Sequence, residues 1–145
     1  MTVDTDPAVG VFFKLKIDDN DLGAWNSCEG LGAEVVLESR EEGGNNLYVW
    51  QLPTRVKYSN VKLTRPLTAD TQKVAKWFAS MAGQISRKTA EIQAVAFDGT
   101  QPVARWGLVG VVPVRWTGPS FNLDSPKVAT ETIEIAHHGF IDTGA

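Results

Sequence analysis

The sequence predicts a mainly β domain, an antiparallel sandwich or barrel-like fold with one flanking α-helix. Three observations lead to this prediction. Several stretches alternate apolar and polar residues, as strands with one buried face do. Short clusters of Gly, Asp, Asn and Pro separate most of these stretches, which is typical of antiparallel strands joined by turns. One stretch alone has apolar residues at helical spacing. We therefore expect about seven strands and one helix, packed in layers.

Length and composition fit one globular domain over residues 1–145, with residues 1–8 as a flexible N-terminal arm. The chain is 43% hydrophobic and 21% charged, and its formal net charge is −3. This balance gives no long-range attraction to nucleic acid or to an anionic membrane surface. No apolar run approaches the roughly 20 residues of a membrane helix, and the N-terminus lacks a secretory signal pattern. We expect synthesis in the cytoplasm and no membrane binding by the monomer.

The first predicted strand covers residues 11–18 and has one dry face. That face consists of Val11, Phe13, Leu15 and Ile17, and the other carries Phe12, Lys14 and Lys16. A turn at Asp18–Asp21 follows. We interpret it as a hairpin turn rather than as a calcium-binding loop, because the later glycine and glutamate of an EF-hand are missing. A short strand is expected at 24–31, and Gly30 and Gly32 mark a bulge or bend there. The next strand is expected at 34–39.

A charged loop follows at residues 40–46. Its members are Arg40, Glu41, Glu42, Gly43, Gly44, Asn45 and Asn46. In a lone domain such a loop is a solvated hairpin tip. Its two glycines permit backbone conformations closed to other residues, so the loop could equally reach a neighbouring molecule. Both interpretations stay open on the residues alone.

Residues 47–66 contain an apolar and aromatic run, a proline, a basic turn and a strand of alternating residues that ends at Pro66. Pro53 has no backbone donor, so a sheet should be interrupted there or left with an edge. Trp50 and Tyr58 are large side chains with a polar tip, a type favoured at interfaces. We expect this segment to meet another copy of the chain.

One helix is predicted after residue 68, capped by Thr68 or Asp70. Its apolar stripe falls at i, i+3, i+4 and i+7 and consists of Val74, Trp77, Phe78 and Met81. An aromatic stripe at this spacing is what core packing requires, so we interpret the helix as a lid on a sheet rather than as a cofactor site.

The C-terminal half predicts strands at 90–97, 103–112 and 128–138. Asp98-Gly99 is a hairpin signal between the first two, because glycine tolerates positive φ. Pro113 should break or end the second of these strands, although residues 114–116 continue in extended form. Residues 121–125 look irregular.

Motifs of catalysis are not found in the sequence: it has no G-x-S-x-G, Walker A, G-x-G-x-x-G or H-E-x-x-H element. His137 and His138 lie near Glu131 and Glu134, but strand neighbours point to opposite faces. Glu134 and His138 share a face roughly 13 Å apart, too far to share one metal ion. We predict no enzyme activity, no cofactor and no metal site, with the histidines bonded to backbone or to a neighbouring subunit.

Cysteine and tryptophan each leave an alternative reading. Cys28 is the only cysteine and lacks a nucleophile signature, so a small buried hydrophobe is the better interpretation. Five tryptophans are compatible with nucleic-acid stacking, but the acidic net charge favours core and interface aromatics.

Together, these stretches resemble the tail-tube family of contractile phage tails and phage-derived extracellular contractile injection systems. The similarity runs from about Gly10 to Phe140. Its elements are FFKLKID, WNSCEGLGAEVVLESREEGGNN, LPTRVKYSNVKLTRPLT, AKWF and VVPVRWTGPSFNLDSPKVATETIEIAHHGF. Thr54 and Pro66 depart from the glycines usual in the family, which bears on local turns rather than on the fold.

The resemblance implies an inner-tube protomer: six-fold rings whose sheets join into one barrel around a lumen, stacked into a tube that a contracting sheath drives into a target. Expected partners are copies of itself, sheath, baseplate and tube-terminating proteins, and cargo in the lumen. The loop 40–46 would be the inter-ring contact. The subunit-contact segment would include Tyr48, Trp50, Leu52, Pro53, Arg55 and Lys57.

Two other functions were weighed. A baseplate protein of the same family would start the tube and form one ring only. A small β-barrel enzyme or ligand-binding module would need a pocket lined by converging polar groups. The residues are compatible with a phage and with an injection system, and Lys14 and Lys16 are compatible with a lumen lining and with plain solvent exposure.

Overall fold

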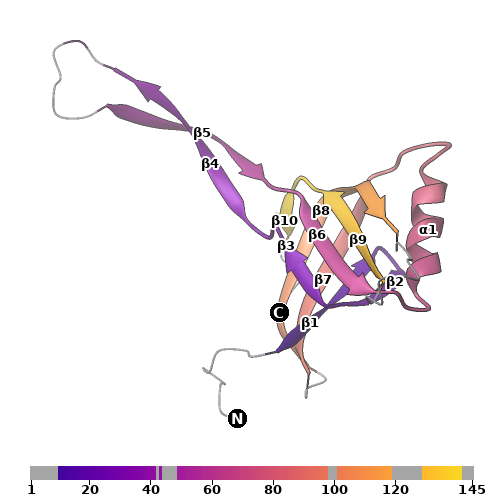
Figure 1. The fold of residues 1–145 in the computed structure, drawn as a ribbon. Coiled ribbons are helices and arrows are strands. Elements are labelled where there is room, and N and C mark those ends of the chain that lie inside the picture. Colours follow the sequence, from indigo (N-terminus) through magenta and orange to yellow (C-terminus); the bar gives the residue numbers. More distant parts are fainter. Residues whose placement is uncertain (1–9, 42, 44–48, 98–100, 119–128, 142–145) are drawn as a thin grey trace, which may run out of the picture.

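The structure is a computed structural model and describes residues 10–41, 43, 49–97, 101–118 and 129–141. These residues form a β-rich body with one helix at its side and a long two-stranded arm (Figure 1). The strands are β1 (Val11–Ile17), β2 (Asn20–Trp25), β3 (Ser27–Glu29), β4 (Ala33–Arg40), β5 (Trp50–Tyr58), β6 (Val61–Pro66), β7 (Lys88–Ala96), β8 (Pro102–Thr117), β9 (Thr130–Ala136) and β10 (Gly139–Ile141), and the helix is α1 (Thr71–Ser80). The predicted mainly β, antiparallel fold with one helix is confirmed.

The body is one antiparallel sheet in the order β2-β1-β7-β8-β9-β6-β3, with β10 added to β8. The long strand β8 belongs to both halves, because its first part pairs with β7 and its last part with β9. Gly110, at φ +63, lies where the strand passes from one half to the other. A side chain there would also collide with the ring of His138. We call β2-β1-β7-β8-β10 the first half-sheet and β8-β9-β6-β3 the second.

Alternation along the strands places the core as the sequence predicts. In β1, Leu15 and Ile17 are buried and Lys14 and Lys16 are exposed. The core joins both half-sheets to the helix. It contains Leu15, Ile17, Leu22, Trp25, Val61, Leu63, Val74, Trp77, Ala90, Ile92, Leu108, Val111, Ile133 and Ile135. Burying such side chains contributes about 1.5–3 kcal/mol each relative to exposure, which makes this core the main source of stability.

The structure refines three strand predictions in detail. The strand expected at 24–31 divides at Asn26, whose N–H donates to the Thr64 carbonyl at 2.9 Å. This bond joins the residue between β2 and β3 to β6. Because β2 and β3 follow each other in the chain but lie at the two ends of the strand order, the sheet curls on itself. Pro113 does not end its strand but sits inside β8, next to a register shift that accommodates its missing donor. The strand expected at 128–138 is shorter, and residues 139–141 form β10.

The helix carries the predicted stripe on its inner side. Val74 and Trp77 are buried, and Phe78 and Met81 pack against the core while half exposed. Its start differs from the prediction, because Asp70 occupies the N-cap position without a side-chain cap bond. The carboxylate of Asp70 pairs with Lys73 at 3.1 Å instead. The predicted arm at 1–8, the hairpin turn at 98–99 and the irregular segment at 121–125 lie outside the described residues.

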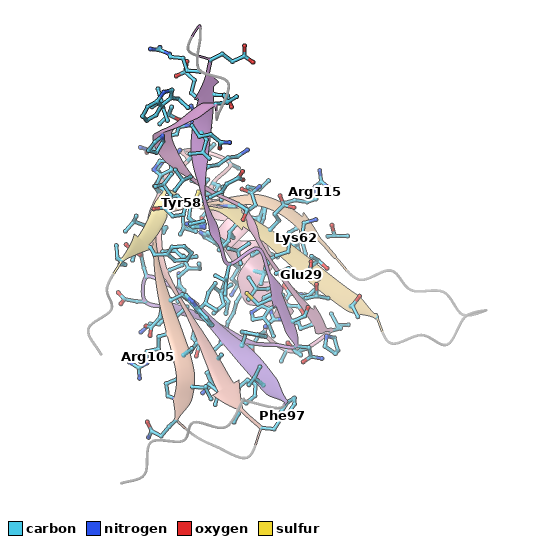
Figure 2. All side chains as sticks on the ribbon, turned by 90° about the vertical axis from the view of Figure 1, so that its left-hand side faces the viewer. Glu29, Tyr58, Lys62, Phe97, Arg105 and Arg115 are labelled. Atoms are coloured by element: carbon cyan, nitrogen blue, oxygen red, sulfur yellow. The ribbon has the colours of Figure 1, made fainter. Side chains whose placement is uncertain are left out.

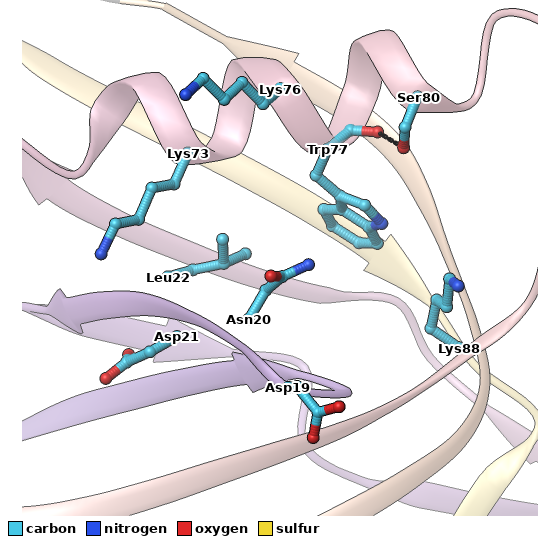
Figure 3. Close-up of a pocket in the computed structure, with 9 residues that line it drawn as sticks. All are labelled: Asp19, Asn20, Asp21, Leu22, Lys73, Lys76, Trp77, Ser80 and Lys88. Atoms are coloured by element: carbon cyan, nitrogen blue, oxygen red, sulfur yellow. Dashed lines mark hydrogen bonds between the residues drawn. The ribbon is translucent and has the colours of Figure 1, made fainter.

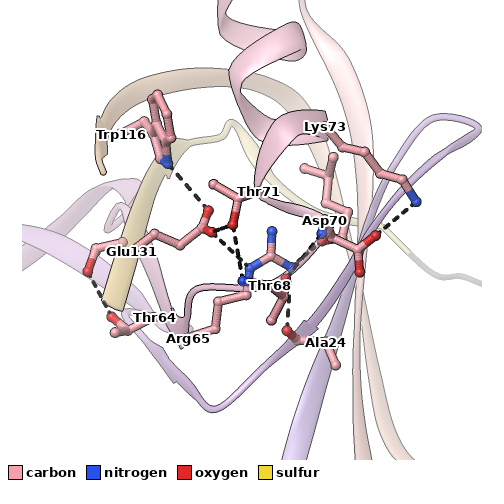
Figure 4. A network of polar contacts seen from close by, with 11 residues as sticks. Ala24, Thr64, Arg65, Thr68, Asp70, Thr71, Lys73, Trp116 and Glu131 are labelled. Carbon is pink, nitrogen blue, oxygen red and sulfur yellow. Dashed lines mark hydrogen bonds and ion pairs between the residues drawn. The ribbon is translucent and has the colours of Figure 1, made fainter. Parts of the chain in front are cut away.

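A buried polar network joins the helix to both half-sheets (Figure 4). The side chains of Arg65 and Glu131 are almost inaccessible, and Arg65 Nε lies 3.5 Å from Glu131 Oε2. Glu131 also accepts hydrogen bonds from the hydroxyl of Thr71 and from Trp116 Nε1. Arg65 Nη1 donates to the Leu22 carbonyl at 2.5 Å. Because the buried charges of Arg65 and Glu131 compensate each other, removing one of these side chains leaves the other as an uncompensated buried charge.

Glu131→Gln should therefore lower the free energy of unfolding by about 3–5 kcal/mol, because Arg65 loses its counter-charge at almost unchanged shape. The measurement is urea unfolding of the monomeric protein followed by far-UV circular dichroism. Asp70→Asn, which breaks the exposed pair with Lys73, is the control and should cost less than about 1 kcal/mol. Equal, small costs for both variants would contradict the role given to the network.

Candidate assembly interface

The strands β4 and β5 form an arm that projects away from the body (Figure 1). They pair antiparallel with each other from Ala33↔Tyr58 to Arg40↔Trp50. Within the part of the chain that the structure describes, neither strand pairs with a third. An isolated two-stranded ribbon is at best marginally stable in water. The arm therefore has two open backbone edges and two faces in need of cover.

Pro53 introduces a bulge in the arm. Leu37 pairs with Pro53 and Val36 with Arg55, so Thr54 is the extra residue on β5. The Thr54 hydroxyl donates to the Val36 carbonyl at 2.8 Å and satisfies that acceptor. The expected basic turn after Pro53 was wrong, because β5 runs on to Tyr58. Thr54 is thus a bulge residue.

One face of the arm is apolar and exposed. Val35 and Val56 face each other across the ribbon, and Leu37 faces Pro53. Val35 and Leu37 are each 50% exposed and Val56 is 48% exposed. We call these four residues the apolar stripe. A contiguous apolar stripe on a thin ribbon is typical of a surface that another molecule covers.

The opposite face is mixed, because charged residues alternate there with Val36, Leu52 and Trp50. Glu34 lies opposite Lys57, and Val36 lies opposite Arg55. Both Lys57 and Arg55 are exposed, as is Trp50 at the outer end, whereas Leu52 is half-buried. In the predicted loop, Arg40, Glu41 and Gly43 are exposed. The other predicted loop and contact residues, Glu42, Gly44, Asn45, Asn46 and Tyr48, lie outside the described residues.

The root of the arm is fixed to the body by aromatic contacts. The ring of Tyr58 lies 5.5 Å from those of His137 and Phe140, centroid to centroid. His137 is buried, and its Nδ1 accepts the N–H of Gly139 at 3.1 Å. The backbone bond of His137 agrees with the predicted alternative to a metal ligand. No local pattern in the sequence indicates that Tyr58 contacts this turn.

A second set of contacts holds the root from the other side. The Ser59 hydroxyl donates to the Gly30 carbonyl at 3.1 Å, and Asn60 Nδ2 donates to Glu134 Oε2 at 2.9 Å. Gly30 has φ +92, and a side chain there would overlap the carbonyl of Asn60. The arm therefore leaves the body through a built junction, which sets its direction.

Among the residues that the structure describes, Glu134 and Cys28 have shifted pKa values. The hydrogen bond from Asn60, reinforced by the positive charges of Lys62 and Arg115, lowers the pKa of the Glu134 carboxyl. Lys62 Nζ lies 3.6 Å from that carboxylate. Burial, with the nearby charge of Glu29, raises the pKa of the Cys28 thiol to about 12. A thiol with such a pKa is protonated at neutral pH and is a poor nucleophile.

A cleft of about 400 Å³ lies between α1 and the β1–β2 turn (Figure 3). Its lining carries both signs of charge and the edge of the Trp77 ring. Two of its lysines are paired, Lys73 with Asp70 at 3.1 Å and Lys88 with Asp18 at 3.6 Å. The residues that line it are Asp19, Asn20, Asp21, Leu22, Lys73, Lys76, Trp77, Ser80 and Lys88. Among the residues described, no cluster of three or more His, Cys, Asp or Glu is arranged to hold a metal ion.

The family model of the T4-like virus tail tube protein gp19 matches residues 9–141. The chain belongs to this tail tube family. The match spans the body, the arm and the turn after β9, so the arm is part of the family's domain. No helix in the described part of this tail tube protein is long and apolar enough to cross a membrane. No curated protein matches the chain.

Solved structures show the same fold. One is a chain of the PVC sheath-tube complex, from an extracellular contractile injection system in the extended state. It has a TM-score of 0.77 and 21% sequence identity, and the alignment covers 95% of this chain and 92% of that chain. A chain of the anti-feeding prophage baseplate gives 0.75 at 19% identity, with 94% and 95% covered. Hcp1 from Flavobacterium johnsoniae gives 0.53 at 15% identity, with 91% and 99% covered.

Asn60→Ala should raise the pKa of the Glu134 carboxyl toward its ordinary value, because the main donor to its ionised form is lost. Carbon-detected NMR titration of the Glu134 side chain measures this directly. A carboxyl whose pKa is lower in the folded state than in the unfolded state stabilises the fold at pH values above its ordinary pKa. The wild-type protein should therefore be more stable than the variant at neutral pH. That advantage should fade as pH falls through the pKa of Glu134. An unchanged titration curve would show that Asn60 does not set the ionisation.

Proposed function

We propose that this protein is the inner-tube subunit of a contractile phage tail or phage-like injection particle, in which hexameric rings stack around a lumen. The observation that carries the proposal is the arm, a family-matched ribbon whose apolar stripe and backbone edges have no cover within the described chain. Covering them with identical copies turns an unstable element into an assembly device. The role is structural, without catalysis.

Ring closure is supported by the edges of the first half-sheet. β2 is its edge on one side, and β10 lies at the other side beside β8. In the described chain, no strand pairs with the outer side of either. A contact between unlike edges of identical copies is heterologous, and it gives a ring when its rotation closes. Six copies then share one continuous sheet around the lumen.

The arm has two separate tasks in this proposal. The segment with Trp50, Leu52, Pro53, Arg55 and Lys57 contacts a neighbouring subunit, and the apolar stripe provides the buried area of that contact. The loop 40–46 at the outer end reaches the next ring. A contact with an apolar centre and a charged rim is typical of specific interfaces.

Further partners follow from the tube role. Similar chains occur in complexes described as a sheath-tube complex, a sheath/tube terminator, a baseplate and a tube-terminating cap. For this protein we propose a sheath outside the tube, baseplate and terminating proteins at its ends, and cargo inside. The subunit is made in the cytoplasm and then joins the particle.

The purified protein should form rings or tubes by self-association. Negative-stain electron microscopy over a range of concentrations is the measurement, with sedimentation velocity as an independent check. The physical reason is that the stripe and the open edges are buried only on assembly. A strictly monomeric species at all concentrations would count against the tube role.

Deleting Glu41–Asn45 should leave the fold intact and prevent rings from stacking. The body does not depend on the outer end of the arm, so the circular dichroism spectrum should match that of wild type. Electron microscopy should show single rings in place of tubes. Long tubes formed by this deletion would remove the inter-ring role from the loop.

A further inference from the structure

An exposed apolar patch lies at the end of the body opposite the arm. Phe97, just after β7, is 72% exposed, and Val103 on β8 is 57% exposed. The ring of Phe12 on β1 lies 6.0 Å from that of Phe97, centroid to centroid. Figure 2 shows Phe97 at the far end from the arm. We call Phe12, Phe97 and Val103 the end patch; they come from three neighbouring strands.

Positive charge borders the end patch. Lys14 on β1 pairs in register with Gln93 on β7, which pairs with Arg105 on β8. The side chains of Lys14 and Arg105 are exposed, and Lys14 Nζ lies 6.0 Å from the Phe12 ring centroid. The three residues form one cross-strand row. Gln93 Nε2 donates to Glu91 Oε1 at 2.8 Å in the next row, where Glu91 pairs with Lys16, so the two rows together carry three positive charges and one negative charge. An acidic partner surface would complement this row.

The outer end of the arm has the matching character. Val49 is 45% exposed there and supplies apolar surface. Glu38 and Glu41 are exposed close by, against the single positive charge of Arg40. The arm end is thus apolar with a negative excess, whereas the end patch is apolar with a positive border.

We propose that the end patch is the acceptor for the arm end of a second copy in the adjacent ring. This inference rests on the proposed tube function and adds the surface that receives the arm. The arm end and the end patch lie at opposite ends of the molecule. A ring whose arm ends bind one neighbouring ring therefore still offers its end patches to another ring on the other side. A head-to-tail contact of this kind repeats without limit along one axis. Apolar burial supplies the affinity, and the charged borders set the register.

The test uses two defective proteins with complementary lesions. The patch variant is Phe97→Ser with Val103→Ser, and the arm variant is the deletion of Glu41–Asn45. Each is purified as rings, and neither should form tubes by electron microscopy. When the two preparations are mixed in equal amounts, intact arms meet intact patches on the other ring. The mixture should then give pairs of rings that grow no further.

The matched control is Ile85→Ser, because Ile85 is 71% exposed but lies outside the end patch. It should form tubes of wild-type length. A second variant, Arg105→Glu, places a negative charge in the positive row. It should yield shorter tubes than wild type, and Glu41→Lys in the same chain should restore part of the length.

Each outcome has a distinct reading. Long tubes from the patch variant, or a mixture that contains only single rings, would overturn the acceptor assignment while leaving the tube function intact. Loss of tubes in Ile85→Ser would also overturn it, because the effect would not be specific to the patch. Absence of rings from the wild-type protein would refute the proposed function, and the acceptor with it. Circular dichroism and thermal unfolding verify that each variant is folded.

Discussion

A two-stranded ribbon cannot bury its own side chains, and the organisation of this protein follows from that limit. Two strands supply one layer, so the apolar stripe of Val35, Leu37, Pro53 and Val56 stays in water until another surface covers it. The body has solved the same problem internally, with a core enclosed by two half-sheets and a helix. The arm has no such layer in the described chain, so its apolar stripe is buried only where another surface covers it.

The body supplies what the arm lacks, a fixed point of departure. Tyr58 packs against His137 and Phe140, and Gly30 admits the backbone of Asn60 at close range. Behind this junction, the Arg65–Glu131 pair holds β6 and β9 together. A buried pair of this kind adds little net stability relative to apolar side chains, but it penalises arrangements that separate its partners. The direction of the arm is therefore set by packing and is not left to a flexible hinge.

Sequence reasoning found what depends on local pattern and missed what depends on register. Alternation predicted β1, and helical spacing predicted α1, because both patterns are set by one face of one element. Pro113 was expected to break or end its strand, with residues 114–116 continuing. The break is a register shift within β8, which runs on to Thr117. The division at Asn26 arises from a bond to Thr64, 38 positions away, which no local pattern contains. The Tyr58 contacts were invisible for the same reason.

Charge shows how position adds to composition. The net charge of −3 argued against long-range attraction to an anionic surface, but a net charge does not specify where the charges lie on the molecule. In the fold, Lys14 and Arg105 fall in one row at one end of the body, whereas Glu38 and Glu41 fall at the outer end of the arm. In the stacking that we propose, two copies end to end bring the negative arm end of one against the positive row of the other. The same residues that leave the isolated chain weakly charged thus favour growth along one axis, the direction in which a tube extends.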